Sequence, residues 1–203
     1  YTNKESISIG VGTMLSDLSK SGKKPHDLLE TFKHHPIIRK IIEGGEAKEY
    51  LAHLIPEGGY NSIPKIVGHG VMVVGDAAQL VNGLHREGSN LAIKSGILAA
   101  EAAITAHQLN DFSENILYSY HRNLMASFVG EDLKKYRDAT DLMSNNPDYF
   151  NVYMPMMAQA LSEFFTVDGV SKWDKQKLIM EMVKDRGLLK TGRDVYRLWK
   201  AVK

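Results

Sequence analysis

The chain has 203 residues, of which 43% are hydrophobic and 24% are charged, and its formal net charge is +1. This is an ordinary globular composition, which argues against disorder and provides no overall basic field for binding nucleic acid. The absence of cysteine excludes disulfides, cysteine-ligated zinc and an iron–sulfur cluster held by this chain. Every apolar run is too short for a transmembrane helix, so a cytoplasmic protein is predicted.

Residues 1–66 have the pattern of pieces of a sheet-containing domain. Alternating side chains over residues 6–11 and the run Ala47 to Ile55 each predict a strand. Between them, Pro25 lies at the start of a predicted helix that ends near Pro36, and a second helix is predicted over residues 37–42. Because the first strand follows almost directly on the first residue, we expect the chain to begin inside a domain.

Residues 67–110 predict one strand followed by one long helix. The run Gly70 to Asp76 is short, apolar and β-branched, which is typical of a central strand buried on both faces of a parallel sheet. From Asn90 to Gln108 the sequence is apolar almost all round, with small residues every three or four positions. Small residues at this spacing let a helix pack closely against a sheet.

After Asn110 the pattern is that of amphipathic helices, so an all-helical C-terminal region is predicted. For the Met- and aromatic-rich segment from Tyr149 to Phe165 we favour a core between these helices over an apolar surface for a membrane, a quinone tail or a partner. Residues 171–203 hold ten Lys or Arg against four Asp or Glu. A solvated face is favoured there over docking on anionic lipid or an acidic redox partner.

The most specific pattern is the end of the predicted strand and the start of the long helix. A carboxylate at Asp76, after Gly75, would lie at the carboxyl edge of a parallel sheet and can accept hydrogen bonds from a polyol. The start of the helix offers free N–H groups and a positive dipole end to an electron-rich group. Gly88 permits close approach of a ligand, and Ser89 or Asn90 can cap the helix. The alternative is a plain strand-ending turn with ordinary helix capping.

This arrangement resembles the second FAD motif of glutathione-reductase-like and aromatic-hydroxylase-like flavoproteins, and more narrowly the FixC-type proteins of the electron-transfer flavoprotein:quinone oxidoreductase family. The matching residues are Gly75-Asp76-Ala77-Ala78, Val81-Asn82, Leu84–Asn90, Lys94-Ser95-Gly96 and Ala99-Ala100-Glu101, then Tyr1–Lys4 with Ser6 and Ala52–Tyr60 upstream, and weakly Phe165–Gly169. Two departures stand out: Gly83 replaces a usual proline, and the Gly-x-Gly-x-x-Gly segment for the ADP half of FAD is absent from these residues.

The resemblance implies the C-terminal part of an α/β flavoprotein with an α-helical tail. In this interpretation residues 1–66 end a substrate- or quinone-type sheet domain, residues 67–110 are the returning strand and helix of the FAD-binding domain, and residues 111–203 are a helical C-terminal region. The cofactor is FAD, and the Asp binds its ribityl chain. The implied cofactor-binding residues are Gly75, Asp76, Ala77, Leu84, His85, Arg86, Gly88, Ser89 and Asn90. For His85 and Arg86 a solvated loop pair is the favoured alternative.

The implied function of the full-length protein is that of an FAD-dependent oxidoreductase. It would accept electrons from electron-transfer flavoprotein and pass them to a ferredoxin-like iron–sulfur protein or a quinone, the latter with peripheral contact at the inner face of the membrane. No catalytic side chain is needed, because FAD carries the redox chemistry. The eight histidines include no pair at i, i+4, so no metal site is predicted. The alternatives are a geranylgeranyl-reductase-like flavin reductase and a catalytically inert isolated domain.

Overall fold

The computed structural model describes residues 1–203 and is mostly helical, with 62% of the residues in helices and one small two-stranded sheet. It divides into two compact units, Tyr1–His53 and Leu54–Lys203. The predicted helical C-terminal region is confirmed. The predicted parallel sheet is not present in residues 1–203, whose two strands run antiparallel.

The first unit contains three short helices, α1 (Leu15–Ser21), α2 (Pro25–Lys33) and α3 (Pro36–Ile42). Proline at the first helical position explains why α2 and α3 begin where they do, since its fixed φ suits a helix start and its missing N–H is not needed there. Both predicted helices are confirmed: the first ends at Lys33, just before Pro36, and the second begins at Pro36, one residue earlier than expected. The strands predicted over 6–11 and 47–55 are wrong: the unit has one isolated bridge, Thr2 to Ile7, and no buried residue to anchor a sheet.

The strands of the second unit form a hairpin of β1 (Val67–Gly68) and β2 (Val71–Met72), in which Val67 lies opposite Met72. The strand predicted over residues 70–76 is present but shorter, since β2 ends at Met72, and within this unit it is not central, because the side chains of Val71 and Val74 are 54% and 38% exposed. A strand is buried on both faces only where other strands flank it. In this unit its one neighbour is β1.

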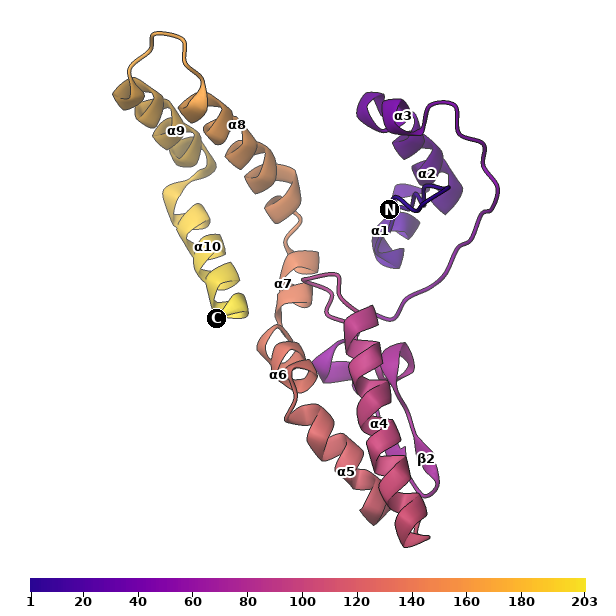
Figure 1. The fold of residues 1–203 in the computed structure, drawn as a ribbon. Helices are drawn as coiled ribbons and strands as arrows, with labels where there is room; N and C mark the ends of the chain where they lie inside the picture. Colours follow the sequence, from indigo (N-terminus) through magenta and orange to yellow (C-terminus); the bar gives the residue numbers. More distant parts are fainter. The chain divides into compact units, whose positions relative to one another are not determined.

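Three helices share one core with the hairpin: α4 (Ser89–Leu109), α5 (Glu114–Met125) and α6 (Phe128–Lys135). A 3-10 turn, η1 (Tyr60–Ser62), precedes β1, and a second, η2 (Gly75–Ala78), lies between β2 and α4. The long helix predicted over 90–108 is confirmed as α4. It lies beside α5 (Figure 1), and its small residues Ala99, Ala102 and Ala106 are buried in the core. The opposite side of α4 exposes isoleucines.

Tyr120 of α5 is the largest fully buried side chain in this core. Its hydroxyl donates a hydrogen bond of 2.9 Å to the carbonyl oxygen of Val73, which ties α5 to the residues after β2. Burial raises the pKa of Tyr120 to about 12, and a hydrogen bond with Ser95 opposes this rise. The buried phenol thus stays neutral well above the usual pKa of tyrosine.

This raised pKa predicts a loss of stability in alkali. Because the folded-state pKa exceeds the unfolded value of about 10, the stabilisation is complete below pH ~10 and falls by about 2–3 kcal/mol as the pH rises to about 12. In Tyr120→Phe the free energy of unfolding should drop by about 1–3 kcal/mol at neutral pH, since Val73 loses its donor, and the alkaline slope should shrink. Urea unfolding at several pH values measures both, with the half-exposed Tyr118→Phe as the control. An unchanged slope in Tyr120→Phe would contradict the prediction.

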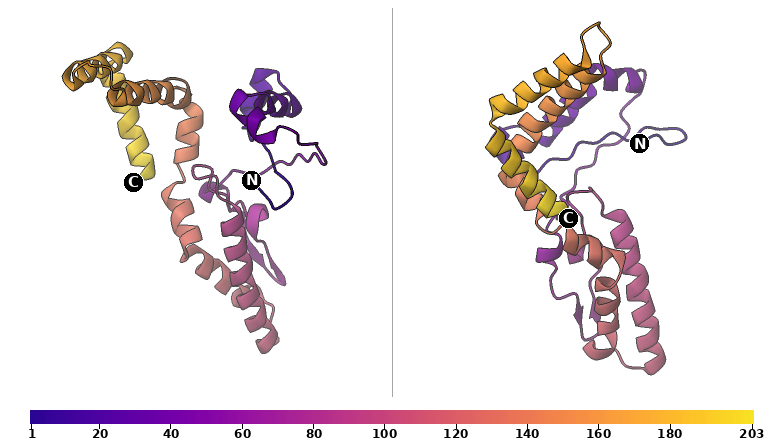
Figure 2. Two further views of the ribbon diagram at one scale, coloured as in Figure 1. Left: turned by 45° about the horizontal axis from the view of Figure 1, so that its top comes forward. Right: turned by 90° about the vertical axis from the view of Figure 1, so that its left-hand side faces the viewer.

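The rest of the unit is a chain of helices: α7 (Ala139–Asn145), a short π-helix η3 (Tyr149–Tyr153), α8 (Met154–Phe165), α9 (Lys172–Arg186) and α10 (Leu188–Val202). Helices α8 and α9 form an antiparallel pair, as Figure 2 shows from two sides. The core predicted for 149–165 is wrong in its larger part. Tyr149 is buried, but the side chains of Met154, Met157 and Phe165 are 52%, 57% and 70% exposed.

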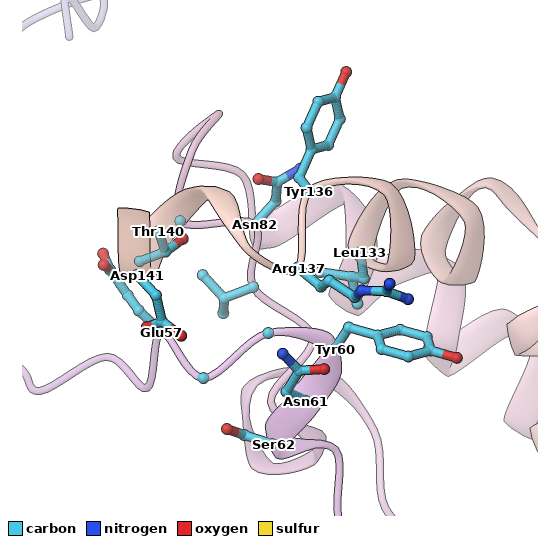
Figure 3. A pocket seen from close by; sticks show the side chains of 14 residues that line it. Glu57, Tyr60, Asn61, Ser62, Asn82, Leu133, Tyr136, Arg137, Thr140 and Asp141 are labelled. Carbon is cyan, nitrogen blue, oxygen red and sulfur yellow. The ribbon is translucent and has the colours of Figure 1, made fainter. Parts of the chain in front are cut away.

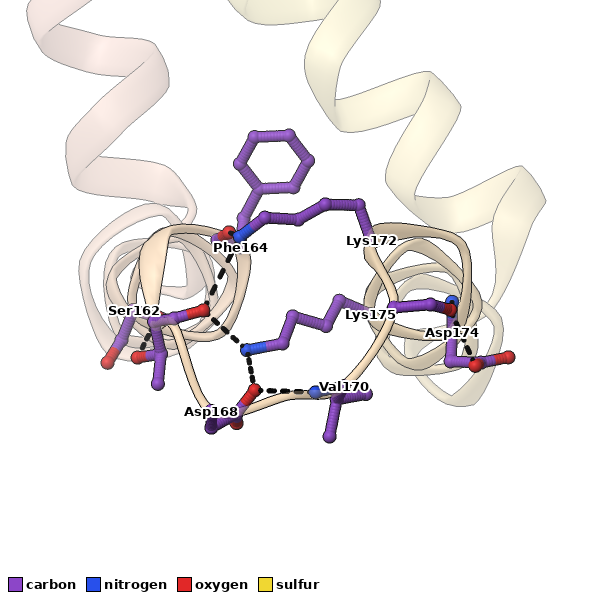
Figure 4. A network of polar contacts seen from close by, with 9 residues as sticks. Ser162, Phe164, Asp168, Val170, Lys172, Asp174 and Lys175 are labelled. Atoms are coloured by element: carbon purple, nitrogen blue, oxygen red, sulfur yellow. Dashed lines mark hydrogen bonds and ion pairs between the residues drawn. The ribbon is translucent and has the colours of Figure 1, made fainter.

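The turn between α8 and α9 is built around a buried lysine (Figure 4). The Lys175 side chain is only 2% exposed, and its ammonium lies 2.8 Å from a carboxylate oxygen of Asp168. The same ammonium donates a 2.7 Å hydrogen bond to the carbonyl oxygen of Thr166. This hydrogen-bonded ion pair lowers the pKa of Asp168. Since both partners of Lys175 lie in the turn, it holds the turn against the first part of α9.

Candidate functional site

The predicted site begins where the chain turns sharply after β2. Gly75 has a φ of 59°, and its N–H donates a 3.0 Å hydrogen bond to the buried hydroxyl of Ser95 on α4. That hydroxyl in turn donates a hydrogen bond of 2.7 Å to the carbonyl oxygen of Ala92. A Cβ on residue 75 would lie 3.3 Å from the Cβ of Ala92. Backbone conformation and close packing therefore both favour glycine, and the turn is attached directly to the first part of α4.

The turn places the Asp76 carboxylate near the start of α4, as predicted. Asp76 is exposed, and its Oδ1 lies 3.8 Å from the position that a Cβ on Gly88 would take. Gly88 is the N-cap residue, and its carbonyl oxygen accepts the first helical hydrogen bond from Ala92 at 2.8 Å. The N–H groups of Ser89 and Asn90 precede this bond and have no intrahelical acceptor. The expectation that Ser89 or Asn90 caps the helix is wrong, since both lie inside it.

The loop between these two points is closed on itself. The backbones of Asn82 and Glu87 exchange two hydrogen bonds, of 2.8 and 3.2 Å. The buried Asn82 side chain accepts two more through Oδ1, from the N–H groups of Leu84 and His85, each at 3.2 Å. Arg86 takes a positive φ of 57° at the tip. Residues 82–87 are thus a defined turn whose shape is held by one asparagine.

His85 and Arg86 are exposed on this loop, yet both contact other parts of the second unit. Arg86 donates a 2.7 Å hydrogen bond through Nη1 to Oε1 of Glu57. The rings of His85 and Tyr136 are 4.6 Å apart between centroids. Sequence reasoning missed Glu57 and Tyr136, because nothing in the local pattern indicates which residues will meet across 29 and 51 positions.

Beside this loop lies a pocket of about 160 Å³ (Figure 3). It lies between residues 57–62, residues 81–83 and the segment from Leu133 to Asp141 on α6 and α7. The second carboxylate oxygen of Glu57, Oε2, is buried without a hydrogen-bond partner. At Gly83 a Cβ would lie 2.8 Å from the Thr140 hydroxyl, so the residue that replaces the usual proline leaves room for α7.

No group of three or more His, Asp or Glu side chains in residues 1–203 is arranged to hold a metal ion. None of the helices is both long enough and apolar enough to cross a membrane.

Comparison with known proteins identifies the family. Residues 139–203 match the ETF-QO/FixC family C-terminal domain. Protein FixC of Bradyrhizobium diazoefficiens is 45% identical over 204 residues, which cover 99% of this chain and 47% of the relative. Protein FixC of Azotobacter vinelandii is 44% identical, over 100% of this chain and 48% of the relative. The probable electron transfer flavoprotein-quinone oxidoreductase YdiS of Escherichia coli is 42% identical, over 96% and 46%.

The chain spans about half the length of the curated relatives that it matches. The resemblance inferred from the residues around Asp76 is confirmed, since the similarity runs through almost the whole chain. The chain belongs to the ETF-QO/FixC family and corresponds to the C-terminal part of its longer members.

Proposed function

We propose that the full-length protein is an FAD-dependent electron-transfer oxidoreductase and that this chain supplies the flavin-ring side of its FAD site. The family is a flavoprotein family and indicates an electron-transfer oxidoreductase. The observation that carries the proposal is the position of the exposed Asp76 carboxylate beside Gly88 at the start of α4. An acceptor for a polyol and donors for an electron-rich ring edge thus lie together.

The residues present fit one half of FAD. Asp76 would accept a hydrogen bond from the ribityl chain, and the N–H groups of Ser89 and Asn90 would face the pyrimidine edge of the ring. Gly88 has no side chain to obstruct this approach. Gly75, Ala77 and the loop from Leu84 to Arg86 would complete the contact. When bound, FAD supplies the redox chemistry, and no side chain of this chain has to act as acid, base or nucleophile.

The ADP half of FAD has no binding segment in residues 1–203, which contain no Gly-x-Gly-x-x-Gly motif. We assign it to the remaining half of the longer protein. In this proposal residues 67–110 belong to the FAD-binding domain, residues 1–66 to a substrate- or quinone-type sheet domain and residues 111–203 to the helical region. The rest of the FAD-binding domain would then cover Val71, Val74 and the exposed isoleucines of α4, which explains their apolar character.

The proposed electron donor is electron-transfer flavoprotein, and the proposed acceptor is a ferredoxin-like iron–sulfur protein or a quinone. Relatives bear the names FixC and electron transfer flavoprotein-quinone oxidoreductase, in line with this pair of roles. The proposed location is cytoplasmic, with peripheral membrane contact if quinone is the acceptor. A prenyl-chain reductase would need a long apolar tunnel, whereas the pocket beside Glu57 has a volume of only about 160 Å³ and many polar lining residues.

The test is a flavin absorbance spectrum of the full-length protein and of the isolated 203-residue chain, each with its intact mass. We expect about one FAD per molecule in the full-length protein and none in the isolated chain, because only one half of the site is present there. A folded, monodisperse full-length protein that purifies without flavin and does not take up added FAD would contradict the proposal. It would support the inert-domain alternative.

A further inference from the structure

Residues 57–62 contact the loop between η2 and α4 near both of its ends. Near the first end, the N–H of Gly58 donates a 3.3 Å hydrogen bond to Oε1 of Gln79. Near the second end, Oε1 of Glu57 accepts the 2.7 Å hydrogen bond from Arg86. One segment from an earlier part of the chain therefore lies against the whole loop that is proposed to contact the flavin.

Two glycines after Glu57 fix the backbone of this segment. A Cβ on Gly58 would lie 2.4 Å from the Cβ of Ser62, so a larger residue would force the segment to shift. Gly59 has a φ of 58°, a conformation that favours glycine. The next residue, Tyr60, packs against the hydrophobic core of the second unit. The backbone next to Glu57 is thus held by the core and not by the loop.

The Arg86 side of the contact is the one that needs support. Arg86 has a φ of 57°, which is unfavourable for a residue with a Cβ and persists where surrounding contacts hold it. Its side chain is 66% exposed and has no other acidic partner within 4.0 Å. Because a free arginine side chain samples many rotamers, the guanidinium would have no fixed position without Glu57.

Glu57 in turn depends on Arg86. Its side chain is 22% exposed and lies in the wall of the pocket shown in Figure 3. One carboxylate oxygen accepts the hydrogen bond from Arg86, and the other is buried without a hydrogen-bond partner. A partly buried carboxylate is costly unless a positive charge compensates it. The two opposite charges therefore stay together, and they present less net charge to the site than a free guanidinium would.

We infer that Glu57 is a positioning residue of the FAD site, which acts through Arg86 by fixing the guanidinium and offsetting its positive charge. This inference rests on the proposed function, since FAD is the group that the loop would contact. A positive charge near a flavin favours its reduced, more negative form and raises the reduction potential. The Glu57 carboxylate thus keeps the potential below the value that an unpaired Arg86 would set.

The test compares Glu57→Gln and Arg86→Gln in the full-length protein by titration of the apoprotein with FAD and by redox titration of the bound flavin. Glu57→Gln, which keeps the shape of the side chain, should raise the dissociation constant for FAD by about three- to fivefold, as expected for a lost ion pair with an exposed partner. Arg86→Gln should raise it at least as much.

The reduction potential separates the role of charge from that of loop shape. It should rise in Glu57→Gln, which leaves the positive charge uncompensated, and fall in Arg86→Gln, which removes that charge. The double variant should lie between the two. Glu57→Asp keeps the negative charge and should have a potential nearer to wild type than Glu57→Gln. A loop that is only loosened would shift the potential in the same direction in both single variants.

The matched control is Glu114→Gln. Glu114 pairs with Lys65 at 2.7 Å, and the two side chains are 31% and 71% exposed, close to the values for Glu57 and Arg86. It begins α5, just after the C-terminal end of α4, whereas the proposed site lies at the N-terminal end of that helix. This change should alter neither FAD affinity nor potential, and circular dichroism should show that all variants are folded.

The outcomes distinguish this inference from the proposed function. A full-length protein that does not bind FAD would overturn both. Bound FAD together with a Glu57→Gln variant that behaves like Glu114→Gln would overturn the role of Glu57 alone. Potentials that move in the same direction in Glu57→Gln and Arg86→Gln would do the same.

Discussion

Replacement of Asp194 by alanine is expected to lower the free energy of unfolding of the second unit by about 3 kcal/mol. The carboxylate is 1% exposed and accepts a hydrogen bond from Tyr153, with Arg186 and Arg193 at 4.0 and 3.6 Å. Its removal leaves the Tyr153 hydroxyl without its acceptor and takes one counter-charge from Arg186, which is only 15% exposed. Because Arg186 retains its ion pair with Asp148, we expect the loss in the free energy of unfolding to lie at the lower end of the range found when one partner of a buried ion pair is removed.

Urea unfolding followed by circular dichroism measures this loss, and Asp185→Ala is the matched control. Asp185 is an exposed carboxylate on α9 without an ion-pair partner, so its replacement should change the free energy of unfolding by less than about 0.5 kcal/mol. Equal effects of the two substitutions would show that the Asp194 cluster does not hold α10 to α7 and η3.

The same cluster predicts a dependence on acid. Burial opposes the charge on Asp194, but hydrogen bonds from Tyr153 and Asn146 and the charge of Arg193 outweigh it and lower its pKa. A carboxylate with a lowered folded-state pKa stabilises the fold above its unfolded pKa of about 3.9 and loses this stabilisation as the pH falls through the folded-state value. The difference in stability between wild type and Asp194→Asn should therefore shrink below about pH 4.

Replacement of Asp76 by alanine in the full-length protein is expected to raise the dissociation constant for FAD by about ten- to a hundredfold. The physical reason is the loss of a charge-assisted hydrogen bond to the ribityl chain, which contributes about 1.5–3 kcal/mol. Asp76 is exposed, and no intramolecular ion pair of its carboxylate is found within 4.0 Å, so the folded state should lose little stability. Titration of the apoprotein with FAD, followed by flavin fluorescence, measures the change.

The matched control for Asp76 is Glu101→Ala, which removes another exposed carboxylate about three turns into α4. It should leave FAD affinity unchanged. If Asp76→Ala also binds FAD like wild type, the role of Asp76 is refuted, while membership of the family stands on the sequence similarity.

Features that depend on neighbouring residues could be predicted from the sequence, whereas features that depend on distant residues could not. Helix α4 and the starts at Pro25 and Pro36 could be predicted or explained from residues at most four positions apart, because helical hydrogen bonds and caps are local. The proximity of Asp76 to the start of α4 was also predicted, since one loop joins them. By contrast, the strands expected over 6–11 and 47–55, and the central position expected for the strand over 70–76, needed partner strands that residues 1–203 do not contain.

What the sequence by itself determined is the family, the helical C-terminal region and the position of the candidate FAD motif. Only the tertiary structure decided that Glu57 pairs with Arg86, that Met154 and Phe165 are exposed, and that the sole acid of a basic helix, Asp194, is buried. The physical reason is that a hydrophobic pattern indicates which side chains tend to be buried, but burial depends on which distant surface arrives to cover them. A charged residue can likewise be buried once distant partners surround it.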